Sequence, residues 1–223
     1  MAHFLDLERW PRRATFEYFR GYDNPYFNVC APLEAGPLVE LVRGVPGTSF
    51  FLAYLYLSLR TANEVEPFRY RLSEGRVLVH ERIHAGTTLL LEDDRFAFAY
   101  FDYTEDFARF QTEARAAMER VRAEGGFDAQ DHRNDLIHYS TLPWISFTSF
   151  SHARNWGKED SVPKIVFGKR DERNGQWLLP VSVEVHHALM DGLHVGRYLE
   201  KLQGYFLEPE AGLGLEWSRE DAS

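Results

Sequence analysis

The sequence predicts an α/β fold in which a mixed β-sheet is covered by helices. Helix-like and strand-like stretches alternate along the whole length of 223 residues, with no internal repeat and no low-complexity tract. Elements mixed in this way pack as layers. The hydrophobic content of 44% is sufficient for one α/β domain with a substantial core. We therefore expect a single domain at residues 1–207, followed by a loose acidic tail at 208–223.

The first third of the chain predicts two helices and a hairpin. Trp10 and Pro11 precede a short helix at 12–20, with Pro in its first turn, and G-Y-D-N-P ends it. The Leu- and Ala-rich run within 36–59 predicts a second helix that stops at Asn63. The segments F-R-Y-R-L and R-V-L-V-H-E alternate on either side of S-E-G, which is typical of a hairpin.

The remaining elements are strands followed by helices. T-T-L-L-L-E and F-A-F-A-Y-F-D-Y predict strands, and a helix should follow from about Glu105 to Ala123. The apolar stripe of that helix consists of Phe107, Phe110, Ala114, Ala117 and Val121. Residues 136–150, 163–169 and 177–187 are three extended stretches, the last two separated by a turn at D-E-R-N-G. Asp191 and Gly192 then lead into a final helix.

Composition limits the possible partners and location. The formal net charge is −9 and the sequence pI is about 5.5, with Lys and Arg scattered, so a phosphate-binding surface for nucleic acid is not expected. The single cysteine, Cys30, excludes an intrachain disulfide and a thiol metal cluster. Charges throughout the first twenty residues do not fit a signal peptide, and the longest apolar run, 50–59, is too short to span a bilayer. We expect a cytoplasmic protein without a membrane partner.

The stretch V-E-V-H-H-A-L-M-D-G-L-H at 183–194 contains the candidate catalytic residues. On a strand, alternate side chains share a face, so His187 groups with the preceding valines, whereas His186 groups with Ser182 and Glu184. The two imidazoles then point apart, which makes joint binding of a metal ion geometrically poor, and no metal site is predicted. His187 is either a hydrogen-bonded core histidine or a general base that burial keeps neutral and a local hydrogen bond holds in one tautomer.

Asp191 has three possible roles. It could cap the final helix, orient His187 as in a catalytic triad, or pair with an arginine elsewhere in the chain. Gly192 permits a tight backbone conformation at this point. Spacing alone does not choose among these roles.

Four motifs in order resemble one enzyme family. H-H-A-L-M-D-G-L-H is similar to the H-H-x-x-x-D-G signature of CoA-dependent acyltransferases. W-P-R-R-A-T-F-E-Y-F, P-F-R-Y-R-L-S-E-G-R-V-L-V-H-E and P-W-I-S-F-T-S-F resemble the corresponding segments of the chloramphenicol acetyltransferases. The match extends from about residue 5 to 206, and it is closer to this family than to dihydrolipoyl acyltransferases or peptide-synthesis condensation domains.

The resemblance implies a fold, a reaction and residue roles. The fold would be an α/β two-layer sandwich that forms a homotrimer with active sites at subunit interfaces. An acetyl group would pass from acetyl-CoA to a hydroxyl of chloramphenicol without an acyl-enzyme. His187 would be the base, Ser149 the donor to the oxyanion, and Lys169 a residue near CoA. Arg12 and Asp191 would form a buried pair that fixes the active-site loop, and breaking such a pair costs about 3–5 kcal/mol.

The acceptor pocket is where the sequence departs from the family. The resemblance assigns six residues to it: Phe19, Asp23, Phe27, Phe96, Phe127 and Val166. Val166 replaces a threonine that holds a water, Glu184 replaces a glutamine and Leu193 an aromatic residue. These changes leave open the same chemistry on a different small hydroxyl or amine acceptor, and Asp23 would favour a cationic one. A non-catalytic relative is a further alternative, against which both His187 and Ser149 argue.

Overall fold

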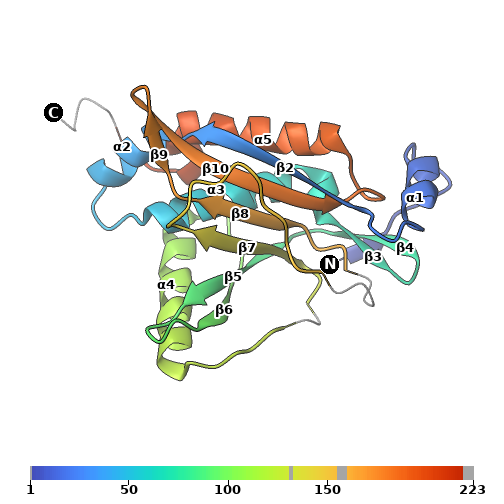
Figure 1. Cartoon of the computed structure of the whole chain (residues 1–223), viewed down its shortest axis with the longest axis horizontal. Helices are drawn as coiled ribbons and strands as arrows, with labels where there is room; N and C mark the ends of the chain where they lie inside the picture. The colour runs from blue at the N-terminus through green and yellow to red at the C-terminus, as the bar shows by residue number, and fades with distance from the viewer. Residues whose placement is uncertain (1, 131–132, 155–159, 218–223) are drawn as a thin grey trace.

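Helices cover one face of a mixed β-sheet in the computed structural model, which describes residues 2–130, 133–154 and 160–217 (Figure 1). The strands follow the order β2-β10-β8-β7-β5-β6, and β9 adds to β10. The pairs β5–β7 and β7–β8 are parallel and the others antiparallel. The strands are β2 (Tyr26–Glu34), β5 (His84–Leu90), β6 (Phe96–Phe101), β7 (Leu136–Leu142), β8 (Lys164–Gly168), β9 (Asp171–Arg173) and β10 (Gln176–His186).

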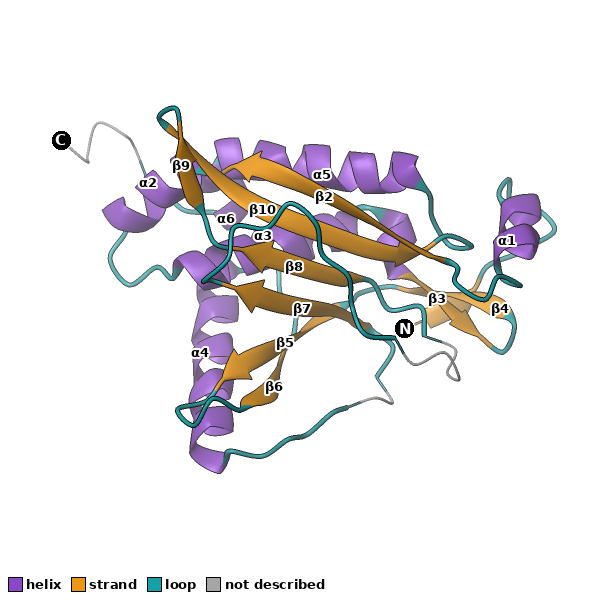
Figure 2. Cartoon of the chain, in the orientation of Figure 1, coloured by secondary structure: helices purple, strands orange, loops and turns teal. Residues whose placement is uncertain are grey.

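The helices confirm the predicted two-layer arrangement (Figure 2). They are α1 (Arg13–Phe19), α2 (Gly36–Gly44), α3 (Phe50–Glu64), a 3-10 turn (Glu66–Arg69), α4 (Phe107–Glu124), α5 (Gly192–Leu207) and α6 (Pro209–Leu213). Helix α5 contacts β2 and α3, α2 contacts β10, and α4 contacts β6. Within the described parts of the chain, none of these helices combines the length and apolar character needed to cross a lipid bilayer.

The predicted hairpin is confirmed and belongs to a second, smaller sheet. Strands β3 (Tyr70–Ser73) and β4 (Arg76–His80) are antiparallel, and β1 (Ala2–Phe4), which was not predicted, pairs with β4. Glu74 and Gly75 both have positive φ, 53° and 70°, as a two-residue turn of this hand requires. Asn174 and Gly175 turn in the same way between β9 and β10, so the predicted D-E-R-N-G turn is confined to N-G.

The predicted second helix is two helices. Helix α2 ends at Gly44, and Gly47 adopts a positive φ of 82° before α3 begins. The Ser49 hydroxyl caps α3 by accepting a hydrogen bond from the backbone N–H of Leu52 at 3.4 Å. Helix α3 is buried on nearly all sides and continues to Glu64, past the expected stop at Asn63. Burial, rather than local helix propensity, keeps the polar last turn of α3 helical.

The extended stretch predicted at 136–150 was wrong in its second half. Strand β7 ends at Leu142, and Pro143, which has no N–H to donate, starts a turn closed by the Ile145 N–H to Leu142 O bond at 3.2 Å. Residues 143–154 then form a loop across the uncovered face of the sheet (Figure 1). Ser149 therefore lies on a loop.

The two faces of the large sheet differ in chemistry. Val181, Val183 and Val185 of β10 are fully buried in the core that the helices cover. The predicted stripe of α4 belongs to the same core, with its first four residues buried and Val121 packed against them. On the other face of β10, Ser182 lies between Cys30 and Val166 in the strand register. Strand β10 therefore presents its polar side chains on the uncovered face.

The expected loose tail was wrong for residues 208–217. Helix α6 buries Pro209 and Leu213, and it contacts α2, α3 and α5. Trp217 packs against the main core, with its indole directly over Gly44. The apolar residues of this segment cover helix ends that would otherwise be exposed. The free energy of burying them outweighs the preference of the acidic residues for solvent. Residues 218–223 lie outside the described residues.

We expect Leu213→Ala to lower the free energy of unfolding by about 2–4 kcal/mol, because it removes a buried side chain and leaves a cavity under α6. Leu207→Ala is the matched control: this leucine is 41% exposed at the end of α5, so its loss should cost less than about 1 kcal/mol. Urea unfolding measures both. Equal small losses would mean that α6 contributes nothing to the folded unit.

Candidate active site

His187 is the first residue after β10, in a turn between two aromatic rings. Its backbone N–H donates to Pro25 O at 2.7 Å. The imidazole stacks on Phe19 of α1, with ring centroids 3.9 Å apart and planes within 6°, and Phe27 of β2 lies 4.8 Å away. Among the described residues, its buried Nδ1 has no hydrogen-bond partner. The ring is thus held by stacking, and the expected tautomer-fixing hydrogen bond is not found.

His186 points to the other face, as alternation predicted. Its Nδ1 accepts a hydrogen bond from Ala188 N at 3.2 Å, and its ring meets Tyr26 edge-on at 5.1 Å. Burial lowers the pKa of His186 to about 4, so it is neutral at pH 7. His186 is a structural residue. In the described ranges, no cluster of three or more His, Cys, Asp or Glu side chains is placed to hold a metal ion.

Arg12 binds the turn that carries His187. Its Nη1 donates to Leu189 O at 2.6 Å and Ala188 O at 3.4 Å, and its Nη2 donates to His187 O at 3.4 Å. Its Nε lies 3.4 Å from Asp191 Oδ2. The predicted contact between Arg12 and Asp191 therefore exists. The two side chains are 16% and 36% exposed, so the pair is not fully buried, and Arg12 acts chiefly on backbone carbonyls.

Asp191 is also the N-cap of α5. Its Oδ1 accepts from Leu193 N at 3.1 Å, while His194 Nδ1 accepts from Asp191 N at 3.1 Å, which completes a capping box. Burial would raise the pKa of Asp191, but the proximity of His194 and Arg12 outweighs it and lowers the pKa. Asp191 makes no hydrogen bond to His187 in the described structure, so capping and the Arg12 contact coexist and a triad role is not supported.

The predicted pocket residues fall into separate groups. Phe19 and Phe27 lie beside His187, near the β2 edge of the sheet, whereas Phe96 and Phe127 lie near the β6 edge. Phe96 and Phe127 are 49% and 65% exposed. Figure 1 shows α1 and β6 at opposite ends of the molecule. One chain by itself does not bring these aromatic groups together.

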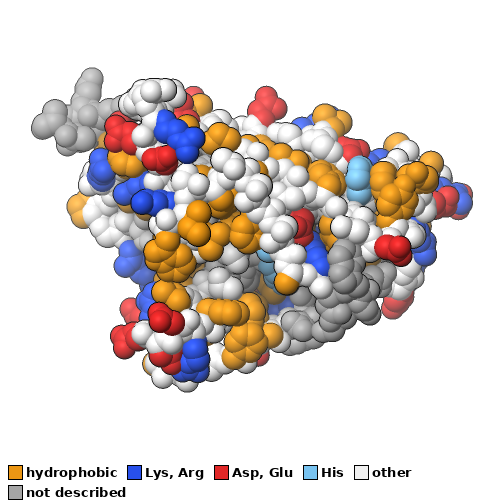
Figure 3. All heavy atoms as spheres, in the orientation of Figure 1, with side chains coloured by type: hydrophobic (Ala, Val, Ile, Leu, Met, Phe, Trp, Pro, Cys, Tyr) orange, Lys and Arg blue, Asp and Glu red, His pale blue; other side chains and the backbone are white. Residues whose placement is uncertain are grey.

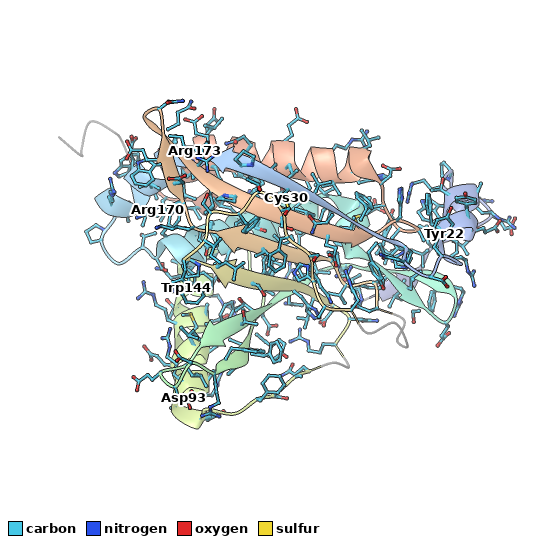
Figure 4. The ribbon with its side chains drawn as sticks, in the orientation of Figure 1. Tyr22, Cys30, Asp93, Trp144, Arg170 and Arg173 are labelled. Atoms are coloured by element: carbon cyan, nitrogen blue, oxygen red, sulfur yellow. The ribbon has the colours of Figure 1, made fainter. Side chains whose placement is uncertain are left out.

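The other candidates also lie apart from His187. Asp23 is exposed in the loop before β2, and Ser149 is exposed in the loop after β7. Lys169 is exposed just past β8, where its backbone N–H donates to Ile145 O at 2.8 Å. Figure 4 marks the two loops by Tyr22, which packs against Phe19, and Trp144, which lies far from it along the long axis. No described hydrogen bond or ion pair links Asp23, Ser149 or Lys169 to His187.

A cavity of about 610 Å³ opens on the uncovered face of the sheet, the side that Figure 3 shows. Ser140 and His138 of β7 line it, and Ser140 lies directly beside Val166 of β8 in the register. Neither His187 nor Ser149 is among its lining residues. Ser140 was missed in the sequence, although alternation could have found it: Ile137 and Tyr139 enter the core, which leaves His138 and Ser140 for the uncovered face.

Charged side chains form one wall of this cavity. Glu184 Oε1 accepts from Arg154 Nε at 2.8 Å, and Arg154 Nη1 donates to Asp160 Oδ2 at 2.7 Å. Burial would raise the pKa of Glu184, but hydrogen bonds from His152 and the Arg154 charge lower it to about 2. Lys164 Nζ lies 3.3 Å from the same Asp160 oxygen. Glu184, which replaces the family's glutamine, thus belongs to a charge network.

Comparison with known proteins identifies relatives along nearly the whole chain. Residues 2–203 match the family model described as chloramphenicol acetyltransferase. The chloramphenicol acetyltransferase of Streptomyces acrimycini is 31% identical over 208 residues, which cover 92% of this chain and 94% of the relative. That of Proteus mirabilis is 25% identical over 202 residues, covering 90% and 93%.

Solved structures agree with these relatives. A chloramphenicol acetyltransferase superposes with a TM-score of 0.84 at 30% identity, covering 93% of this chain and all of that one (100%). The dihydrolipoamide acetyltransferase of Azotobacter vinelandii superposes with a TM-score of 0.66 at 18% identity, covering 90% and 88%. The second likeness shows a shared fold alone.

We expect Arg12→Met to cost more stability than Asp191→Asn. Losing the guanidinium leaves the carbonyl oxygens of 187–189 without their donor, which should cost about 1–3 kcal/mol. Asn at 191 keeps a capping oxygen and removes only a partly exposed ion pair, for less than about 1 kcal/mol. Urea unfolding of both variants checks the order; an equal or larger loss in Asp191→Asn would make the ion pair the dominant contact.

Proposed function

The chain belongs to the chloramphenicol acetyltransferase family, and on that premise we propose that it transfers an acetyl group from acetyl-CoA to a hydroxyl of a small acceptor. Chloramphenicol is the leading acceptor, because the relatives that match the chain along its length carry its name. The observation that carries the proposal is His187, half-buried between Phe19 and Phe27 at the end of β10.

His187 acts as the general base in this proposal. A neutral imidazole takes the proton from the acceptor hydroxyl while that oxygen attacks the thioester carbonyl of acetyl-CoA. The tetrahedral intermediate then collapses, the bond to sulfur breaks, and the CoA thiolate leaves and recovers the proton from the imidazolium. The acetyl group passes directly to the acceptor, so no acyl-enzyme forms. Arg12 keeps the backbone of His187 in place through the carbonyls of the turn.

Two serines compete for the role of oxyanion donor. Family resemblance points to Ser149, which is exposed on a loop with no described contact to the cavity. Position favours Ser140, whose hydroxyl lines the cavity beside Val166 on rigid strands. A donor must be preorganised where negative charge develops, and a strand holds it better than an exposed loop. This criterion makes Ser140 a second candidate. Ser149 keeps the role that the resemblance gives it, because exposure in one chain is what a site between subunits would show.

A homotrimer would reunite the separated halves of the site. His187 with Phe19 and Phe27 would come from one subunit, and the cavity with Ser140 and its aromatic rim from the next. The exposed rings of Phe96, Phe127 and Trp144 are apolar surface of the kind that subunit interfaces cover. Lys169 remains our candidate for a CoA contact, and we propose the cytoplasm as the place of action.

The closest alternative keeps the chemistry and changes the acceptor. The charged wall of the cavity and Val166 in place of threonine both favour that alternative. A non-catalytic relative has no observation in its favour, because His187 and its aromatic neighbours are in place.

We expect His187→Ala to abolish acetyl-CoA-dependent release of CoA with chloramphenicol, measured with a thiol reagent. Ser149→Ala should lower turnover about a hundredfold or more, as for other single oxyanion donors, while Ser140→Ala should stay within a few-fold of wild type. The reverse order would make Ser140 the donor. CoA release by His187→Ala at the wild-type rate would remove the base from the mechanism.

We expect light scattering to give three times the monomer mass. Co-expression of His187→Ala with Ser149→Ala should restore part of the activity, because mixed trimers contain interfaces at which both functional residues are wild type. Each variant expressed alone is the control. A fully inactive mixture that is confirmed to contain mixed trimers would place both residues of each site in the same subunit.

A further inference from the structure

The cavity on the uncovered face has a chemistry that suits a particular class of acceptor. Resting on the function proposed above, we propose that the cavity holds the acceptor and that its preferred acceptor carries a carboxylate, which binds against Lys164 and His138. The two side chains lie on neighbouring parallel strands, in register with each other, and both line the cavity.

The carboxylates at and beside this wall, Asp160 and Glu184, are already engaged by donors of the chain. Asp160 Oδ2 is shared by Arg154 and Lys164, and Asp160 Oδ1 accepts from the backbone N–H of Val162 at 3.1 Å. Glu184 Oε1 is taken by Arg154, and its Oε2 by the backbone N–H of His152 at 3.4 Å. A cationic acceptor would have to compete with these donors for a carboxylate oxygen.

Donor capacity, by contrast, remains. Lys164 Nζ has three N–H groups and two described partners, Asp160 at 3.3 Å and Ala153 O at 3.4 Å, both at the long end of the hydrogen-bond range. The lysine side chain is only 14% exposed, so its charge is not fully hydrated. Burial lowers the pKa of His138 to about 4, which leaves a neutral ring with one N–H, and the ring makes no hydrogen bond to a described residue. A ligand oxygen would accept from the remaining N–H of Lys164 and from the N–H of His138.

Chloramphenicol offers poor hydrogen-bond acceptors to the donors of this wall. Its aromatic ring ends in a nitro group, whose oxygens accept hydrogen bonds weakly, so binding would strip water from Lys164 and His138 with little return. Phe98 and Tyr100 line the same cavity and can pack against a flat apolar portion. The cavity is therefore amphipathic: an aromatic wall for the body of the acceptor and a donor-rich wall for a carboxylate at its far end.

Two analogues of chloramphenicol test the proposal, with the nitro group replaced by a carboxylate or by a carboxamide. Both keep the hydroxyl that receives the acetyl group. We expect wild-type kcat/KM, measured by CoA release, to favour the carboxylate about tenfold, as one charge-assisted hydrogen bond does over a neutral one. Lys164→Gln should remove this preference. Lys201→Gln, at an exposed lysine of α5 paired with Glu64, should retain it.

Calorimetric binding of the same analogues without acetyl-CoA separates the two proposals. Equal kcat/KM and equal affinity of wild type for carboxylate and carboxamide would overturn the acceptor class while leaving acetyl transfer intact, and this comparison needs no variant. If the carboxylate analogue binds in a Lys164-dependent way but CoA release does not exceed the rate of His187→Ala, acetyl transfer is overturned and the proposed ligand class stands. An effect of Lys164→Gln on the KM of acetyl-CoA alone would also overturn the acceptor assignment.

Discussion

The contact on which the candidate site depends is that of Arg12 with the turn after β10. One guanidinium reaches the carbonyl oxygens of three consecutive residues, 187–189, and also approaches the carboxylate that caps α5. It thereby joins the end of a central strand, the start of a helix and the N-terminal segment at one point. Since the His187 ring has no hydrogen bond of its own at Nδ1 in the described structure, its placement depends on this backbone clamp and on stacking with Phe19. A planar side chain with five donors suits this task, and a lysine could not replace it.

Side chains alternate along β10, so its two faces have different roles in the fold. Its valines supply the centre of the helix-covered core, while Ser182, Glu184 and His186 face the open side. Glu184 is buried there only because Arg154 and the backbone of His152 satisfy its oxygens. A single strand thus supports the core, contributes Glu184 to the charge network beside the cavity and leads into His187, the proposed base. The positive and negative charges of the network balance one another. The network therefore acts on a ligand through its remaining hydrogen-bond donors and not through a net charge.

Family membership and the departures from the family describe different parts of the molecule. The family match and the shared fold support shared chemistry. The cavity wall contains Lys164, Arg154 and two histidines, which a ligand without a charged group would cover with little return. Chemistry and acceptor choice can diverge because Lys164 and His138 lie on β8 and β7, whereas His187 follows β10. A change in the wall does not disturb the clamp that holds the base.

Local patterns in the sequence were sufficient to predict the layered α/β fold, the hairpin, the stripe of α4 and the opposite orientations of His186 and His187. The Arg12–Asp191 contact was predicted once the family resemblance was recognised. Local patterns could not show that α2 and α3 are separate helices, that residues 209–217 pack on the core, or that Ser149 leaves the sheet, because long-range burial and a proline's missing N–H decide those points. The sequence by itself determined which residues are able to do the chemistry. Only the tertiary structure decided which of them meet, since register and strand order place Ser140 beside Val166 and leave Phe19 and Phe96 at opposite edges of the sheet.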